Sequence, residues 1–261
     1  MGEADVQQVK PKILDIIYQD DHLVAINKPA HLACIPGRAE PECVVGLLAA
    51  QLGLPCKGEA DPRLRVVHRL DKDTTGVLLF AKDIESQRAL SNQFQNNLVR
   101  KEYMALVIGR PFEGQGEIDA PLMPDRAVVG KMAVNKRGKP AVTRWKLEQA
   151  FRGVSLMRAF PQTGKTHQIR VHLKHIGHPL AVDELYGPPV DERGAGLFLS
   201  QFKRGYRTGK DGSERPLIAR LTLHAEKLTF THPDGRSIQL TAPLPKDFRA
   251  TLNMLGKYAV G

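Results

Sequence analysis

The stretch that decides the fold is residues 66–76, which read Val66-Val67-His68-Arg69-Leu70-Asp71-Lys72-Asp73-Thr74-Thr75-Gly76. Apolar, β-branched runs of strand length, 66–70 and 76–82, lie on either side of a charged and turn-rich connection. We therefore predict two strands joined by a loop that carries several charged side chains at the edge of the core.

Asp71 is the residue of most interest in this loop. If strand geometry persists to Asp71, this carboxylate shares one face with Arg69 while Leu70 points into the core, because side chains alternate along a strand. The Asp71 carboxylate and the Arg69 guanidinium would then lie side by side at the edge of the core. The alternative is a turn in which Asp71 or Asp73 bonds its own backbone.

Other segments predict the elements around this loop. Helices are expected at 42–52, ended by Gly53, then after a cap at Asp83 as far as residue 97, and at 166–176, ended by Gly177. Strands are expected at 13–20, 22–28, 101–109 and 154–160, and the Pro233-Asp234-Gly235 turn indicates a hairpin near the carboxyl end.

Two segments rich in glycine, proline and basic residues, 111–141 and 187–220, predict exposed and positively charged loops. Strands outnumber helices and several are joined by tight turns, which favours an α+β fold over a regular βαβ array. We expect a mixed, mainly antiparallel sheet flanked by helices and basic loops. One domain should span 13–255, with an amino-terminal extension at 1–12 and a carboxy-terminal tail at 256–261.

Composition narrows the function classes. The 261 residues are 42% hydrophobic, enough for a sizeable core. They contain no apolar run of about 18 residues and no apolar stretch near the start, so a soluble, cytoplasmic protein that does not enter membranes is expected. The three cysteines, Cys34, Cys43 and Cys56, are never spaced Cys-x-x-Cys, which argues against disulfides and a zinc knuckle. A net charge of +10 attracts polyanions, of which nucleic acid is the commonest.

The segment 68–76, HRLDKDTTG, closely resembles the HRLD-x-x-T-S-G signature of pseudouridine synthases of the RluA family. Further segments resemble the family's motifs in the same order, so that the resemblance covers about residues 13–250: IYQDDHLVAINKP at 17–29, KEYMALV at 101–107, TGKTHQIRVHL at 163–173, and the closing hairpin at 223–225 and 242–245.

The resemblance implies a pseudouridine synthase fold and an enzyme that isomerises uridine in structured RNA, either ribosomal or transfer RNA. Asp71 would be the catalytic carboxylate, Arg170 its ion-pair partner and Tyr103 the ring that stacks on the target uracil. Arg69 would fill the space left when the nucleotide is flipped out of its stack. The uracil would leave its ribose, rotate and rejoin through carbon, which needs no metal and no cofactor.

The same resemblance leaves several points open. Asp71 could attack the base, attack the sugar or abstract a proton. Thr75 and Lys165 stand where the family usually has serine and arginine, and only about a dozen residues precede the similar region, without the amino-terminal S4 RNA-binding module that many members carry. RNA is the expected partner of a monomer with no obligatory protein partner, and the choice of target would depend on loops and RNA shape.

Four other interpretations compete with this one. Gly164-Lys165-Thr166 suggests a P-loop, but Ala159 stands where that motif requires its first glycine. The histidines at 167, 172, 175 and 178 form no His-Glu-x-x-His metal motif. Asp71 and Asp73 could be a glycosidase pair, although no second feature supports a carbohydrate cleft. A catalytically silent RNA-binding or ribosome-assembly factor is the main rival, and it would not require Asp71, Tyr103 and Arg170 together.

Overall fold

The structure is a computed structural model that describes residues 13–37, 42–55, 63–209 and 213–260. Its helices are α1 (Val44–Leu52), α2 (Ile84–Gln95), α3 (Gln168–His175) and α4 (Lys246–Tyr258), with a 3-10 turn, η1 (Leu199–Gln201). Its strands are β1 (Asp15–Gln19), β2 (Leu23–Lys28), β3 (Arg65–Val66), β4 (Thr75–Ala81), β5 (Arg100–Ile108), β6 (Gln115–Asp119), β7 (Leu122–Pro124), β8 (Met132–Val134), β9 (Val142–Ala150), β10 (Val154–Pro161), β11 (Leu223–Thr231) and β12 (Ser237–Thr241).

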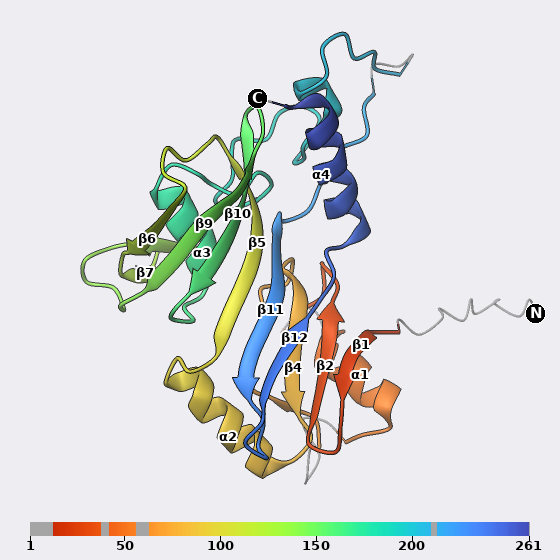
Figure 1. Ribbon diagram of the computed structural model, residues 1–261, viewed down its shortest axis with the longest axis vertical. Coiled ribbons are helices and arrows are strands. Elements are labelled where there is room, and N and C mark those ends of the chain that lie inside the picture. Colours follow the sequence, from red (N-terminus) through yellow and green to blue (C-terminus); the bar gives the residue numbers. More distant parts are fainter. Residues whose placement is uncertain (1–12, 38–41, 56–62, 210–212, 261) are drawn as a thin grey trace, which may run out of the picture.

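Ten of these strands form one sheet in the order β1-β2-β4-β11-β5-β10-β9-β6, with β3 paired to β4 and β12 paired to β11 (Figure 1). The pair of β4 and β11 is parallel, whereas the other pairs in this sheet are antiparallel. β7 and β8 form a separate hairpin. The prediction of an α+β fold with a mixed, mainly antiparallel sheet is therefore confirmed.

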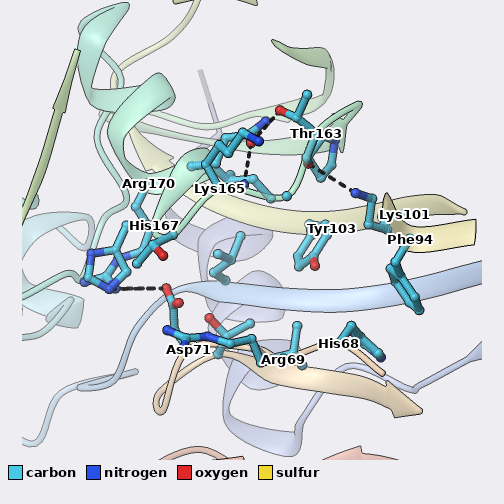
Figure 2. Close-up of a pocket in the computed structure, with 18 of the residues that line it drawn as sticks. His68, Arg69, Asp71, Phe94, Lys101, Tyr103, Thr163, Lys165, His167 and Arg170 are labelled. Carbon is cyan, nitrogen blue, oxygen red and sulfur yellow. Dashed lines mark hydrogen bonds and ion pairs between the residues drawn. The ribbon is translucent and has the colours of Figure 1, made fainter. Parts of the chain in front are cut away.

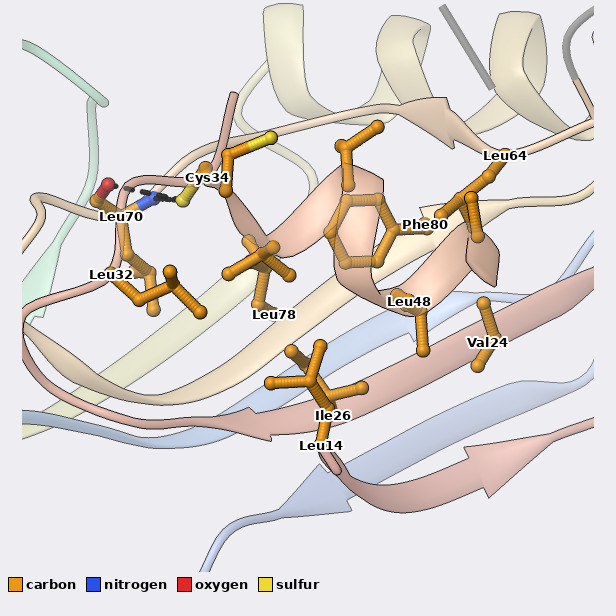
Figure 3. Packing of buried hydrophobic residues seen from close by; sticks show 14 of the residues in the cluster. Leu14, Val24, Ile26, Leu32, Cys34, Leu48, Leu64, Leu70, Leu78 and Phe80 are labelled. Atoms are coloured by element: carbon orange, nitrogen blue, oxygen red, sulfur yellow. Dashed lines mark hydrogen bonds between the residues drawn. The ribbon is translucent and has the colours of Figure 1, made fainter. Parts of the chain in front are cut away.

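Helices cover both faces of the part of the sheet that contains β2 and β4. Val24 and Ile26 of β2 join the cluster of α1, which also contains Leu48 and Phe80 (Figure 3). The alternate residues of β2, including Leu23, belong to the cluster that contains Leu90 of α2. Because side chains alternate along a strand, the two clusters lie on opposite faces of the sheet.

The part of the sheet that contains β5 and β10 is covered in the same way. Ala105 of β5 belongs to the cluster of α3, and Leu106 belongs to the cluster of α4. The sequence pattern did not predict α4, which runs through residues 256–258 of the expected tail and is followed by the fully buried Ala259. None of the helices among the described residues is long and apolar enough to cross a membrane.

Most predicted elements are present, with shifted ends. Asp83 caps α2 by accepting a hydrogen bond from the backbone N–H of Ser86, and Gly53 ends α1 in the left-handed region at φ 62°. The prediction that α3 begins at residue 166 is wrong, because His167 adopts a left-handed φ of 54° that interrupts the helix. The Pro233-Asp234-Gly235 turn joins β11 to β12 as expected.

The two basic segments match their predictions to different extents. Residues 111–141 contain β6, β7 and β8 and are therefore not one open loop, although the side chains of Lys136, Arg137 and Lys139 are exposed. The segment 187–220 is largely irregular around η1, apart from residues 210–212, which lie outside the described part. Cys34 and Cys43 are buried free thiols, as expected, and Cys56 lies outside the described residues.

Gly76 marks the closest approach of two strands that are far apart in the chain. It pairs with Ala225 of β11, its φ is 115°, and a Cβ atom at Gly76 would lie 2.1 Å from the carbonyl oxygen of Ala225. A glycine is therefore required where the sequence motif 68–76 ends.

We expect Gly76→Ala to lower the free energy of unfolding by about 2 kcal/mol or more, because it adds both backbone strain and a backbone clash. Denaturant unfolding measures this change. Gly114→Ala is the matched control, since φ at Gly114 is not positive and a Cβ atom added there would meet no other atom within 4 Å. Equal stability of the two variants would contradict the expected strain at Gly76.

Candidate active site

The loop that carries Asp71 leaves the sheet early. The expectation that the strand continues to Asp71 is wrong, because β3 ends at Val66. β2 pairs along one edge of β4, so β3 and β11 share the other edge, and β11 pairs there with Thr75 and Gly76. The backbone N–H of Leu79, between these two pairings, donates instead to Nε2 of His68 at 3.0 Å. A side chain thus replaces the missing strand partner.

Leu70 is nevertheless buried, as predicted, and its backbone N–H lies 3.3 Å from Sγ of Cys34. The loop then turns back, with the N–H of Thr74 bonded to the carbonyl oxygen of Asp71. This backbone turn does not use the Asp71 carboxylate, which remains available. The carboxylate of Asp73 lies 2.8 Å from Nδ1 of His31.

The side chain of Lys28 holds the loop that carries Asp71 in place. Its side chain is fully buried at the end of β2, and Nζ donates to the carbonyl oxygens of Pro29, Lys72 and Thr74 at 2.8, 2.6 and 3.0 Å. Burial lowers the pKa of Lys28 to about 8. The sequence motifs did not point to this role. A lysine directly before a proline, at the end of an apolar strand, was the available signal.

Arg170 of α3 joins two carboxylates. Its Nη1 lies 3.0 Å from Oδ2 of Asp71, while Nε and Nη2 donate to the two carboxylate oxygens of Asp183 at 2.7 and 2.8 Å. The Asp183 side chain is fully buried, and it also accepts the backbone N–H groups of Leu185 and Tyr186. Burial opposes the charge of Arg170, but its hydrogen bonds to Asp183 outweigh this effect and raise its pKa. The predicted pairing of Asp71 with Arg170 is therefore present.

His167 and Tyr186 complete this end of the site. The Tyr186 ring lies under the guanidinium of Arg170, 5.0 Å from ring centre to Cζ. Its hydroxyl accepts the backbone N–H of Met132 and lies 2.9 Å from Nδ1 of His167. Burial lowers the pKa of His167 and favours the neutral ring. Because the Tyr186 hydroxyl donates its proton to Nδ1 of His167, the single proton of the neutral His167 ring lies on Nε2. This Nε2 is 3.9 Å from Oδ2 of Asp71 (Figure 2).

Tyr103 lies where two hydrophobic clusters meet. It projects from β5 and packs against both the cluster of α1 and the cluster of α3. Burial raises the pKa of its hydroxyl, with a further contribution from the charge of Asp71. The phenol therefore stays neutral, and its ring forms part of the wall of the site.

These side chains line one cavity of about 590 Å³. Asp71, Tyr103, His167 and Arg170 contribute to its wall, and so does the exposed Arg69. The structure thus brings all four site residues predicted from the sequence to one cavity. Asp183 lies in none of the quoted motifs, and Lys28 lies in the segment 17–29 but was given no role there. Asp183 holds Arg170 in place, and Lys28 holds the loop that carries Asp71. The cavity is large enough for a nucleotide that has left its stack.

The other interpretations of the sequence find less support. In the loop 163–166, the N–H of Lys165 bonds the side chain of Gln168, so it does not form part of a phosphate cradle. His172 is fully buried and bonded to Thr143 and Ala120. Among the described residues, no group of three or more His, Cys, Asp or Glu side chains is arranged to hold a metal ion.

Residues 22–175 match the family model described as RNA pseudouridylate synthase. The chain belongs to this family. It is similar to the ribosomal large subunit pseudouridine synthase D of Nitrosomonas europaea, with 40% identity over 246 residues that cover 93% of this chain and 65% of the relative. The corresponding protein of Xanthomonas campestris pv. campestris is 38% identical over 244 residues, which cover 93% and 69% of the two chains. The chain thus spans about two thirds of the length of these relatives.

A solved structure supports the same family fold. The human protein titled RNA pseudouridylate synthase domain containing 4 superposes with a TM-score of 0.70 at 29% identity, and the match covers 93% of each chain. The fold is therefore shared over 93% of the chain, which is more than the segment 22–175 matched by the family model.

His68 of the family's signature segment generates a prediction about pH. Its ring stacks on Phe94 at 4.6 Å between centroids, and its Nε2 must be unprotonated to accept the Leu79 N–H. Burial lowers the pKa of His68 to about 3, with a smaller contribution from Lys101. Between pH 6.5 and 3 the unfolded state therefore binds a proton that the folded state does not, so stability falls as pH falls.

We expect the free energy of unfolding of the wild type to decrease by roughly 2 kcal/mol from this residue alone between pH 6.5 and 4.5. His68→Gln retains an acceptor for Leu79 but has no titrating ring, so its stability should decline less over the same range. Urea unfolding of both proteins at several pH values measures the difference. Parallel curves for the two proteins would show that His68 does not titrate in the expected way.

Proposed function

We propose that this protein is an RNA pseudouridine synthase that converts a uridine of large-subunit ribosomal RNA to pseudouridine. The observation that carries the proposal is the Asp71 carboxylate, held by Arg170 at the wall of a nucleotide-sized cavity beside the ring of Tyr103. The relatives named for the ribosomal large subunit favour ribosomal RNA over transfer RNA as the substrate. The formal charge of +10 suits a polyanionic partner.

The cavity suits a flipped uridine. Tyr103 offers a flat face on which the uracil stacks, and stacking of this kind tolerates rotation of the base within its plane. Arg69, exposed at the rim, can occupy the space that the extruded nucleotide leaves in the RNA. During the reaction the bond from ribose C1′ to uracil N1 breaks, a bond from C1′ to C5 forms, C5 loses a proton and N1 gains one.

Asp71 is held ready for this reaction as a carboxylate. Arg170 stabilises its negative charge, and Asp183 supplies the second negative charge that keeps the buried arginine paired on both sides. Attack on the base, attack on the sugar and removal of a proton are all chemically open to this carboxylate. Neutral His167 directs its Nε2 toward Asp71 and adds no second cation to the pair.

The proposal is tested by incubating the protein with transcripts of large-subunit ribosomal RNA and of transfer RNAs, followed by pseudouridine-specific chemical mapping. New pseudouridine at a defined position of the ribosomal transcript is expected. A catalytically silent RNA-binding factor would bind the same transcript without forming product. Product only in transfer RNA would contradict the proposed substrate.

Asp71→Asn should reduce product formation at least about a thousandfold while RNA affinity changes by no more than several-fold, because the shape and the phosphate contacts remain. Asp73→Asn is the matched control, since Asp73 lies in the same loop and its carboxylate pairs with His31 at the surface. Single-turnover rates and filter binding measure both properties. Substantial turnover by Asp71→Asn would remove the assigned role.

Arg170→Lys should lower the single-turnover rate roughly 10- to 100-fold with a modest change in RNA affinity, because a single ammonium cannot reproduce the three N–H contacts to Asp71 and Asp183. Arg220→Lys is the control: Arg220 makes a similar two-bond pair with Asp247, outside the main cavity. A control that loses as much turnover as Arg170→Lys would show that general destabilisation causes the effect.

A further inference from the structure

One end of the main cavity carries two lysines that the arrangement around Asp71 does not use. Lys101 comes from β5, and Lys165 comes from the loop between β10 and α3 (Figure 2). Nζ of Lys101 donates to the carbonyl oxygen of Thr163 at 3.1 Å. An ammonium has three N–H donors, so two donors of Lys101 are left for another acceptor.

The lysine end lacks a negative charge of its own. Among the described residues that line the cavity, the only carboxylate is Asp71, which Arg170 already holds. Burial lowers the pKa of Lys101 to about 8, and the charge of Lys165 contributes in the same direction. Two cations thus lie near each other in a partly desolvated cavity without a carboxylate to compensate them. Such an arrangement costs free energy unless an anion enters.

The neighbouring side chains suit a nucleotide. His68 is neutral, since burial lowers its pKa to about 3, and its ring is stacked on Phe94. Asn97 adds an amide to the lining of the cavity. The His68 ring, the Asn97 amide and the two lysines therefore offer contacts to a nucleotide backbone. Within the described part of the chain, no carboxylate at this end of the cavity would repel a phosphate.

The spacing along β5 relates the lysines to Tyr103. Lys101 and Tyr103 are two residues apart on one strand, so their side chains lie on the same face, about 7 Å apart along it. A nucleotide whose base stacks on Tyr103 must have its chain continue along the cavity. Figure 2 shows Lys101 and Tyr103 as neighbours, with Asp71 on the far side of Tyr103 from Lys101.

We propose that Lys101 and Lys165 form a binding site for an RNA backbone phosphate next to the target uridine. The proposal rests on the proposed function, because it places the uracil on Tyr103. It also gives a purpose to Gly164-Lys165-Thr166, which is not a P-loop. The backbone N–H of Lys165 is occupied by Gln168, so the phosphate is bound by side-chain ammonium groups. The site holds the strand whatever the neighbouring base is.

The test compares binding of the dinucleotide UpU with binding of its methylphosphonate analogue, in which the single charged phosphate is replaced by a neutral group. NMR titration measures both affinities without any turnover. The wild type should bind UpU roughly tenfold more tightly than the analogue, as expected for loss of a charge-assisted contact. Lys101→Met should bind the two ligands equally, because methionine keeps an unbranched side chain of similar bulk but carries no charge.

Lys165→Met, on an external loop, should also lose the preference and serves if Lys101→Met does not fold. Lys146→Met is the matched control, since Lys146 is an exposed strand residue outside the lining of the cavity, and it should keep the tenfold preference. Equal binding of both ligands by the wild type, or a preference kept by both cavity variants, would overturn the proposal. Failure of the proposed function would appear separately, as absence of pseudouridine in the ribosomal transcript.

Discussion

Arg170 lies between the carboxylates of Asp71 and Asp183, and the rest of the site depends on this interaction. A buried guanidinium without partners would cost several kcal/mol, and a buried Asp183 without Arg170 would cost a similar amount. Each group therefore requires the others at fixed positions. α3 must present Arg170 from one side, the chain after β10 must return to place Asp183, and the loop after β3 must deliver Asp71.

Rigid supports on the same face of the sheet meet this requirement. The clusters of α1 and α3 both reach Tyr103, so the ring lies at the seam between two packed regions. Lys28 anchors the Asp71 loop from the α1 side, and Asp183 anchors Arg170 from the α3 side. The carboxylate and the arginine are thus brought together from two different cores. Packing on both sides limits how far either group can move from the other.

The site residues predicted from the sequence came from the resemblance of its motifs to those of the RluA family. Asp71, Arg69, Tyr103 and Arg170 were assigned in this way, and they do line one cavity. The strand predicted before Asp71 was too long, because no local pattern shows that β11 shares the same edge of β4 as β3. Tertiary pairing decided that boundary, and alternation along the chain could not.

Long-range partners were missed for the same reason. Asp183 lies in an irregular segment beside Glu184, and its bond to Arg170 exists only in the folded chain. The amphipathic α4 was not predicted, because it directly follows a stretch with two prolines. Its last residues were assigned to the expected tail instead. The basic segment 111–141 contains three strands, because the pairing of β6 with β9 and of β7 with β8 overrides its glycines and prolines. Roles that depend on contacts across the chain become visible only in the folded structure.

The parallel pair of β4 and β11 has a consequence for the order in which the molecule can fold. Thr75 and His224, whose side chains are 2.8 Å apart, are separated by 149 positions in the sequence. The edge of β4 next to the Asp71 loop is therefore completed only by a late part of the chain, and closing so large a loop is slow compared with forming local hairpins. During synthesis the amino-terminal half leaves the ribosome first. A partly made chain can collapse around α1 and β2, yet it has no finished site until residues near 225 have emerged and joined the sheet.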